Sequence, residues 1–400
     1  MTEVTRGPQA PPGGVAATRG DAGRPSVGGR RDVVLTGMSV TSGYGRGVAP
    51  LLAGVLAGTP AFGPVERFDV SGRRVRVAAA MPGAPVLDED LVFAAFSATG
   101  DAGVPAAELA GTRLLLAVHA DPDQPRVEPG HRRDRSAAAL ARRVARGACL
   151  GDPLRVYTSA CVAASTAVAD AAALISRGRF DRLVVAGGYL VDADQFALFD
   201  AGRAMATDGR VRPFSAGRTG LLLGDGVAAV VLESGDAARA RGATPLARLA
   251  GWGRAGDAYH VCQPRPDGEG MARAIGTALD RAGVPASEVG YVNAHGSGTG
   301  FSDVSETAAL RLAGLAGTPL SSTKALHGQA LEASGLLELV LTVAAVRAGQ
   351  LPVNAGYLGP DEECALDLIL DAPRPPKTPY ALSLNAAFGG ANTALLVEAL

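Results

Sequence analysis

The sequence predicts an α/β protein in which β-strands and α-helices alternate along the chain and stack in layers. Apolar runs typical of buried strands recur through the chain, and helical stretches lie between them. Alternation of this kind favours a parallel-rich sheet covered by helices. The chain has 400 residues and 47% hydrophobic content, which exceeds a usual single domain and can fill a large core. Two core-forming halves are therefore expected.

Order in the first half is expected to begin at residues 32–37, an apolar strand that runs into a glycine turn. Residues 1–31 before it are rich in Gly, Pro and Arg, which predicts a disordered arm. The remaining expected strands of this half are 114–118, 155–158, 183–186 and 227–232, and its expected helices are 137–146 and 162–177.

The second half repeats the theme. Its expected strands are 246–251, 289–293, 320–322, 380–384 and 393–400, with a helix over 270–282. The closing segments 220–233 and 388–398 both join glycines to an apolar strand, which indicates an internal duplication. We place the boundary of the two halves, 32–235 and 236–400, in the Gly/Ala/Arg-rich stretch before Pro245.

Composition narrows the class of function. A net charge of −1 gives no electrostatic reason to expect nucleic acid or a membrane surface as the partner. There is no long uninterrupted apolar run and no signal-peptide pattern at the N-terminus. The cysteines lack metal-ligand spacing, and no glycine-rich turn continues as a phosphate-binding signature, so no metal and no cofactor are expected. These features are typical of a cytoplasmic enzyme with reduced thiols.

Cys161 is the first candidate catalytic residue. It follows a short apolar strand and precedes an apolar helix that ends near Gly178, in the sequence VYTSACVAAS. A thiol at a helix N-terminus meets free N–H groups and the positive end of the dipole, which favour the nucleophilic thiolate. A buried cysteine without chemistry is the alternative at this point, since Cys is often a core residue.

His295 is the second candidate. It ends an expected strand and stands on a glycine-rich turn, in the sequence YVNAHGSGTG. Glycines there let the backbone approach a ligand, and strand ends are where α/β folds place chemistry. Asp303 and Glu306 follow at the start of a helix, where the dipole favours acidic groups; either could instead pair with a buried lysine.

Lys324 is the third. It lies in SSTKALHGQALEASG, and the chain contains one further lysine, Lys377, because arginine supplies all other basic residues. A lysine retained within an apolar strand–turn–helix indicates a need for a compact point charge that arginine cannot replace. We expect Lys324 to be a buried ammonium group paired with Glu306.

Taken together, these motifs resemble those of the β-ketoacyl synthases (ketosynthases) of the thiolase superfamily, over about residues 32–400. The resemblance is carried by seven ordered segments, which makes it specific. They are TSAC at 158–161, RPFS at 212–215, GDG at 224–226, NAHGSGT at 293–299, the pair Asp303 and Glu306, STK with its glycines at 322–335, and FGGAN at 388–392. The resemblance implies a thiolase-like fold of two pseudo-duplicated halves, with a layered α-β-α-β-α core.

The resemblance also implies the roles of the site residues. Cys161 would carry the acyl group, backbone N–H groups of Cys161 and Phe388 would form the oxyanion hole, and Gly389 and Thr299 would line the substrate site. His295 would be one of two neutral donors to a thioester oxygen that becomes an enolate. The second histidine of the family is expected at position 329, where this chain has Gln329. An amide donates a hydrogen bond but cannot move a proton.

His327 lies two residues before that position and is expected to point elsewhere. The family implies a carrier protein, acyl or peptidyl, with a phosphopantetheine arm, and a homodimer or a heterodimer with a ketosynthase-like subunit. Arginines at 132, 133, 135, 142, 143 and 146 are expected to form a solvated helix face, or a basic patch for an acidic carrier.

Three functions remain open from the sequence. The first is a ketosynthase of polyketide-type, antibiotic-like metabolism that condenses an acyl-cysteine with a malonyl-type extender. The second is a repurposed cyclase or acyltransferase that keeps the acyl-cysteine but does not decarboxylate. The third is a non-catalytic chain-length-factor-like subunit, against which Cys161, His295 and Lys324 count together.

Overall fold

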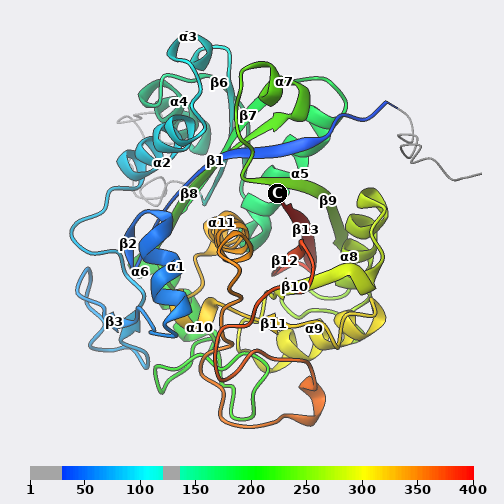
Figure 1. The fold of residues 1–400 in the computed structure, drawn as a ribbon. Helices are drawn as coiled ribbons and strands as arrows, with labels where there is room; N and C mark the ends of the chain where they lie inside the picture. The colour runs from blue at the N-terminus through cyan, green and yellow to red at the C-terminus, as the bar shows by residue number, and fades with distance from the viewer. Residues whose placement is uncertain (1–28, 120–135) are drawn as a thin grey trace, which may run out of the picture. The chain divides into compact units, whose positions relative to one another are not determined.

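The computed structural model describes residues 29–119 and 136–400 (Figure 1). Residues 31–400 make up the compact unit discussed below. The predicted disordered arm lies outside the described residues up to position 28, as do Arg132, Arg133 and Arg135. Within the described residues, no helix is both long enough and apolar enough to span a bilayer.

A single hydrogen-bonded path of strands runs through both halves of the described chain, in the order β11-β10-β12-β13-β9-β1-β8-β7-β5-β6. The strands of the first half are β1 (Val33–Ser42), β5 (Arg113–Val118), β6 (Gly151–Tyr157), β7 (Arg182–Tyr189) and β8 (Gly226–Ser234). Those of the second half are β9 (Ala247–Gly256), β10 (Val289–Asn293), β11 (Leu320–Ser321), β12 (Tyr380–Ala387) and β13 (Ala391–Ala399). Short strands β2 (Gly45–Arg46), β3 (Gly63–Pro64) and β4 (Val77–Ala78) lie off this path.

The two halves have the same topology. In the first, β1 is followed across the sheet by the last strand β8, then β7, β5 and β6; in the second, β9 is followed by β13, β12, β10 and β11. Strand directions also match, because β5 runs parallel to β6 and β7 as β10 does to β11 and β12, whereas β8 and β13 are antiparallel to both neighbours. The pseudo-duplicated fold expected from the sequence is confirmed, while the boundary at 235/236 stays a prediction.

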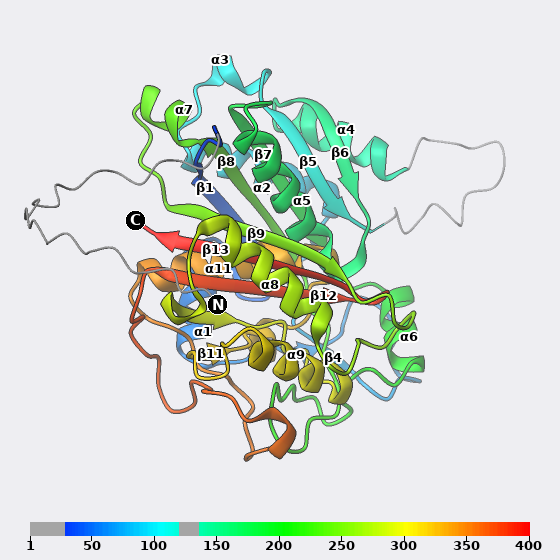
Figure 2. The same cartoon turned by 90° about the vertical axis from the view of Figure 1, so that its right-hand side faces the viewer.

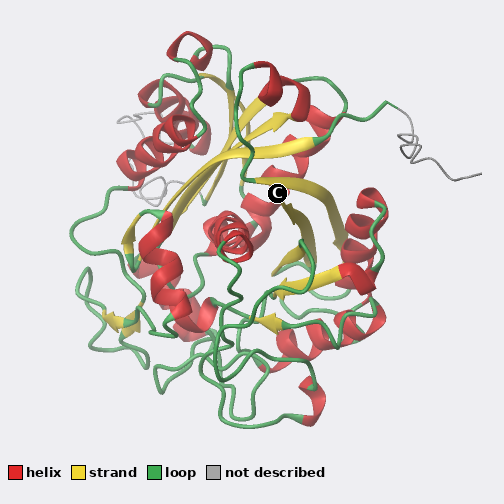
Figure 3. Ribbon diagram, viewed as in Figure 1, coloured by secondary structure: helices red, strands yellow, loops and turns green. Residues whose placement is uncertain are grey.

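The two halves meet where β1 pairs with β9 through only two residue pairs. Helices α5 (Ala163–Ser176) and α11 (Ser334–Arg347) both contact strands of both halves, so they form the middle layer (Figure 3). They approach closely, because a Cβ on Gly335 would lie 2.6 Å from the Ser165 nitrogen. Thirteen residues of α11 are buried, which explains why the sequence of this helix is largely apolar on every side.

The outer layers are helical. Helices α2 (Leu87–Asp101) and α4 (Ala137–Gly147) cover the first half, and α8 (Glu269–Ala282) and α9 (Gly300–Leu312) cover the second, with α8 over β9 and β13 (Figure 2). The remaining helices are α1 (Val48–Leu56), α3 (Ala106–Leu109), α6 (Ala193–Ala201), α7 (Gly235–Ala240) and α10 (Lys324–His327), with 3₁₀ turns at Ala286–Glu288 (η3) and Glu362–Cys364 (η5). The layered α-β-α-β-α order follows directly.

The first strand differs from its expected form. It does not end in a glycine turn at position 37 but continues to Ser42, with a bulge between Leu35 and Gly37. A Cβ at Gly37 would lie 2.2 Å from the Ala98 carbonyl oxygen on α2. Glycine is needed here because the outer helix packs directly on the strand, which the sequence pattern does not distinguish from a turn.

Candidate active site

Cys161 lies in η2 (Ala160–Val162), a single 3₁₀ turn that joins the end of β6 to the start of α5. The preceding residue, Ala160, has φ 48°, a left-handed conformation that costs a non-glycine residue about 1–2 kcal/mol. The strand–turn–helix expected around the thiol is present, and the turn η2 contacts strands β12 and β13 of the second half. The thiol side chain lines a cavity of about 840 Å³.

The environment of the thiol corrects one expectation. Burial and the carboxylate of Glu332 raise the pKa of Cys161 to about 12, against the opposing effects of Lys324 and Gln329. The residue is 7% exposed. Its place at a helix N-terminus therefore does not by itself produce a resting thiolate, because loss of water around the sulfur outweighs the favourable interactions.

His295 follows β10 and enters the same cavity from the second half of the molecule. Glu306 accepts hydrogen bonds from the backbone N–H groups of His295 (2.8 Å) and Gly296 (2.7 Å). Asp303 likewise accepts from Phe214 (2.8 Å) and Gly298 (3.1 Å). The two carboxyl groups at the start of α9 thus fix the backbone turn that carries the histidine.

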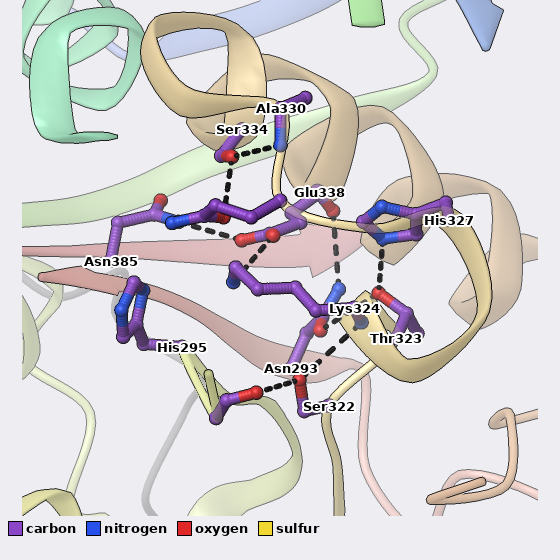
Figure 4. A network of polar contacts seen from close by, with 12 residues as sticks. Asn293, His295, Ser322, Thr323, Lys324, His327, Ala330, Ser334, Glu338 and Asn385 are labelled. Atoms are coloured by element: carbon purple, nitrogen blue, oxygen red, sulfur yellow. Dashed lines mark hydrogen bonds and ion pairs between the residues drawn. The ribbon is translucent and has the colours of Figure 1, made fainter. Parts of the chain in front are cut away.

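The predicted pairing of Lys324 with Glu306 is wrong. The Nζ of Lys324 lies 2.5 Å from Oε1 of Glu338, a buried acid on α11 (Figure 4). The other oxygen, Oε2 of Glu338, accepts from Nδ2 of Asn385 at 2.6 Å. Glu306 instead accepts hydrogen bonds with both of its oxygens from the backbone of the histidine turn.

Burial, and to a smaller extent Lys324, keep the two nearby histidines uncharged. Burial and the ammonium group of Lys324 lower the pKa of His295 well below its usual value of 6.5. His295 lies beside the lysine in Figure 4, and its Nδ1 is buried without a hydrogen-bond partner among the described residues. The ring is therefore a neutral imidazole with one N–H to donate. It does not have to lose a proton before it can act as a neutral donor.

Gln329 lies in the cavity next to the thiol. The hydroxyl of Ser334 donates to Oε1 of Gln329 at 2.9 Å and accepts from the N–H of Ala330 at 3.1 Å. Since the oxygen of the amide is occupied, its NH₂ group is the end that faces Cys161, whose pKa it lowers by hydrogen bonding. The amide is therefore an oriented donor at the position that resembles the family's second histidine.

His327 is fully buried and lies away from this cavity, as expected. Its Nδ1 is 2.8 Å from the carbonyl oxygen of Gly328, which can only accept, so Nδ1 carries the proton. Its Nε2 is 2.9 Å from Oγ1 of Thr323 (Figure 4). Burial and Lys324 lower the pKa of His327 to about 3. This histidine stabilises the turn around Lys324 through its contacts with Thr323 and Gly328, and it cannot replace a catalytic histidine at position 329.

Of the other expected site residues, Phe388 and Thr299 line the cavity, whereas Gly389 does not. Phe388 is on the turn between β12 and β13, is 52% exposed, and stacks on Phe199 with ring centroids 5.9 Å apart. The N–H of Gly389 donates to the Val261 carbonyl at 2.9 Å, so this glycine shapes the turn and has no free donor. Thr299 lines the cavity, and its Oγ1 is 2.8 Å from Oγ of Ser297.

Several residues that matter here were not found from the sequence. Glu338 and Ser334 stabilise Lys324 and Gln329, and both lie on the apolar helix α11. An acid within a helix that is otherwise apolar is a signal for a buried partner, and Glu338 could have been found that way. No sequence pattern points to Ser334, since a serine near a helix start is usually a cap.

Comparisons with known proteins identify the family of this chain. The family models described as "Beta-ketoacyl synthase, N-terminal domain" and "Beta-ketoacyl synthase, C-terminal domain" match residues 92–238 and 246–357. "Putative polyketide beta-ketoacyl synthase 1" of Streptomyces cyaneus is 33% identical over 412 residues, which cover 92% of this chain and 98% of that protein. This chain belongs to the beta-ketoacyl synthase family.

Other proteins similar to this beta-ketoacyl synthase family member include a further curated synthase and a solved ketosynthase structure. The 3-oxoacyl-[acyl-carrier-protein] synthase 2 of Staphylococcus aureus is 34% identical over 255 residues, 62% of this chain and 63% of that protein. Among solved structures, "The ishigamide ketosynthase/chain length factor" superposes with a TM-score of 0.85 at 29% identity, covering 93% of this chain and 100% of that one. The ketosynthase-type fold expected from the sequence is thereby confirmed.

Proposed function

We propose that this chain is a ketosynthase-type acyltransferase of polyketide-type specialised metabolism. It would take an acyl group from a carrier protein onto Cys161 and join it to a malonyl-type extender by Claisen condensation. The observation that carries the proposal is the cavity in which Cys161, His295 and Gln329 meet, with the amide of Gln329 turned by Ser334 to donate.

The first step is acyl transfer. The sulfur of Cys161 attacks the thioester carbonyl of the carrier, and the carrier thiol leaves with the proton of the cysteine. The oxyanion of the tetrahedral intermediate would accept from the backbone N–H groups of Cys161 and Phe388, since η2 packs against β12 next to the Phe388 turn. A thiol with a raised pKa reacts only as it loses its proton, so a base or the leaving group must take it.

The second step is condensation. The malonyl thioester loses CO₂, its α-carbon forms the new bond to the acyl carbonyl, and the Cys161 sulfur leaves and regains a proton from solvent. Negative charge collects on the extender's thioester oxygen during decarboxylation. His295 and Gln329 offer two neutral N–H donors for that oxygen, and donors aimed at developing charge are the main source of rate in such sites.

Access for a carrier arm is available at the mouth of the cavity. Arg203, exposed and in a left-handed conformation with φ 54°, lies at the rim with Thr219 and Gln263. On α4, Arg142 and Arg146 are exposed, whereas Arg143 pairs with Asp88 at 2.7 Å. Another solved neighbour is a type II polyketide acyl-carrier protein in complex with its ketosynthase (TM-score 0.83, 26% identity). We propose the same class of partner, a carrier with a phosphopantetheine arm.

A second ketosynthase-like subunit is also proposed. Within residues 29–119 and 136–400, strand β6 pairs with β5 alone and is the last strand of the sheet, with Asp152 and Arg155 exposed. A sheet edge next to the nucleophile turn can be extended by the same strand of a second subunit. The solved neighbour that combines a ketosynthase with a chain length factor supports this proposal, and homodimer and heterodimer are the two forms to test.

The cyclase or acyltransferase alternative has one specific observation in its favour. Gln329 has no titratable group, so any proton transfer at this end of the cavity must be made by another residue. The chain-length-factor alternative is disfavoured by the intact nucleophile turn and by the Lys324–Glu338 pair, which a non-catalytic subunit has no chemical need to keep.

The test uses a malonyl carrier labelled with ¹³C at its carboxyl carbon and an acyl carrier as donor. A ketosynthase releases labelled CO₂ in proportion to β-ketoacyl carrier formed, and Cys161→Ala abolishes product. Cys262→Ala, which changes the other cysteine lining the cavity, is the matched control and should leave product formation unchanged. Acyl transfer without labelled CO₂ would support the cyclase or acyltransferase alternative and overturn the proposal.

A further inference from the structure

A second polar pair, His119 and Glu332, lies near the nucleophile. His119 directly follows β5, and Glu332 lies on η4 (Leu331–Ala333), a 3₁₀ turn just before α11. The Nδ1 of His119 is 2.9 Å from Oε1 of Glu332. This pair takes no part in the chemistry described above, and no motif singled out in the sequence includes His119.

Glu332 is held beside the nucleophile by the fold. Its side chain is 2% exposed, and Oε2 is buried with no hydrogen-bond partner among the described residues. Leu331 before it has φ 38°, so the backbone accepts strain to form the turn. The turn η4 packs against η2, which carries Cys161, and against the ends of β5 and β7. The charge of this carboxylate raises the pKa of the Cys161 thiol, and Oε2 has no hydrogen-bond donor among the described residues to offset that charge.

His119 connects that carboxylate to solvent. Its side chain is 51% exposed, and its Nε2 is 3.0 Å from the side-chain amide of Gln195 on α6. Nδ1 must carry a proton to face a carboxylate. An amide can present either its oxygen or its NH₂ group to Nε2, so Gln195 is compatible with both the imidazole and the imidazolium.

We infer that His119 is a positioning residue for the nucleophile: as an imidazolium it neutralises Glu332, so that the Cys161 thiolate forms next to a neutral pair and not next to a bare carboxylate. The inference rests on Cys161 as the nucleophile of the proposed function, but not on the condensation step. Its effect is electrostatic and acts through Glu332, which is why His119 itself need not touch substrate.

The charged surroundings are consistent with this role. The hydrogen bond to Glu332 raises the pKa of His119, against the effect of partial burial. Below that pKa the pair is neutral, and above it the pair carries one negative charge, which opposes a second charge on the sulfur. The other titratable groups that act on the pair or on the thiol are Asp192 at the start of α6, Tyr189 at the end of β7, and Lys324. Asp225 acts on Tyr189.

The test measures how fast Cys161 reacts with a methanethiosulfonate reagent between about pH 6 and pH 9, by peptide mass spectrometry of the full chain without any carrier. Glu332→Gln should speed modification, increasingly so at higher pH, by about tenfold at the upper end. His119→Gln should slow it about tenfold at the lower end, where the wild-type histidine is charged. Modification of Cys262 in the same samples is the internal control.

The double variant decides the mechanism. If His119 acts through Glu332, then His119→Gln has no effect in the Glu332→Gln background. Equal rates in wild type and Glu332→Gln across the pH range would overturn the inference, as would an undiminished effect of His119→Gln in the double variant. Should His119→Gln fail to fold, the Glu332→Gln profile alone still decides. The assay needs no carrier, so it tests the electrostatic role of His119 separately from condensation. A protein without condensing activity can still confirm or contradict that role.

Discussion

Ser334 fixes which end of the Gln329 amide faces the nucleophile. Its hydroxyl donates to Oε1 of Gln329 at 2.9 Å, and its own acceptor position is filled by the N–H of Ala330 at 3.1 Å. The two residues lie at the start of α11 and just before it, so a rigid buried helix sets the geometry. An amide thus becomes a donor of defined direction, which is the property that the proposed condensation needs from position 329.

Ser334→Ala should therefore weaken decarboxylation more than acylation. Without the hydroxyl, the amide of Gln329 can turn either end to the cavity, and a lost hydrogen bond of this kind is worth about 1 kcal/mol, or about fivefold in rate. We expect that decrease in the rate of β-ketoacyl formation, measured with the acyl-enzyme already formed. In a Gln329→Ala background the same change should have no further effect; a full fivefold loss there would show that Ser334 acts on something else.

Gln329→Ala should separate the two half-reactions. Acylation of Cys161 uses the backbone donors of the oxyanion hole and should fall by less than about threefold, whereas decarboxylation loses an oriented donor and should fall about 10²–10³-fold. Gln329→His is the informative companion, since it restores a donor and adds a titratable group. Rates of acyl-enzyme formation and of CO₂ release check both; an equal loss in both half-reactions in Gln329→Ala would contradict the assigned role.

Lys324→Met should destabilise the protein, because it leaves the buried carboxylate of Glu338 without its ion-pair partner. Removing one member of a buried pair costs about 3–5 kcal/mol of unfolding free energy. Lys377→Met removes the other, exposed lysine and is the matched control, expected to change stability by less than about 0.5 kcal/mol. Denaturant unfolding of the two variants measures the difference. Similar midpoints for both would show that the ion pair contributes little.

The two buried histidines should lower stability as the pH drops below the ordinary histidine pKa. Asp303 and Glu306 act in the opposite direction, because burial raises their pKa values to about 7 and about 8. His295 and His327 are buried as neutral rings, and the pKa of each is lowered by burial and Lys324, to about 3 for His327. The unfolded chain takes up their protons below about pH 6.5 and the folded chain does not, so their contribution is complete above that pH and is lost on acidification. Each should contribute about 2 kcal/mol of loss between pH 7 and pH 5.

Denaturant unfolding of the wild type and of His327→Gln, each at pH 7 and pH 5, isolates the contribution of one histidine, because the buried acids are present in both proteins. His327→Gln should reduce the difference in unfolding free energy between pH 7 and pH 5 by the contribution of one histidine. It should also lower stability at both pH values, because the contacts with Thr323 and Gly328 are broken. A pH dependence unchanged by the substitution would mean that His327 titrates normally in the folded protein.

The fold was predictable because local pattern and tertiary structure agree in this chain. The strand expected at 289–293 is β10, and the helix expected at 162–177 is α5, since apolar runs bounded by glycines mark elements that are buried on both faces. The end of β1 was misplaced at Gly37 because a glycine needed for helix packing and a glycine needed for a turn look the same in sequence.

The site was predictable in its parts but not in its pairings. Each of Cys161, His295, Lys324 and Gln329 could be singled out from its own motif, and the first, second and fourth do share one cavity. The partner of Lys324 could not be predicted, because Glu306 and Glu338 are both acids within a helix that follows a site motif. Only the packed structure shows that Lys324 pairs with Glu338, while Glu306 binds the backbone of the histidine turn. His119 and Glu332 are 213 positions apart, and no local pattern relates them.

The central claim is that Cys161 carries an acyl group, which is then transferred to the α-carbon of a malonyl-type extender. Intact-mass spectrometry of the enzyme with an acyl carrier, before and after addition of a malonyl carrier, tests it most directly. We predict one added acyl mass that maps to Cys161, is absent in Cys161→Ala, and disappears as β-ketoacyl carrier is formed. An acyl mass that persists with malonyl carrier unconsumed, or no acyl mass on Cys161, would contradict the account.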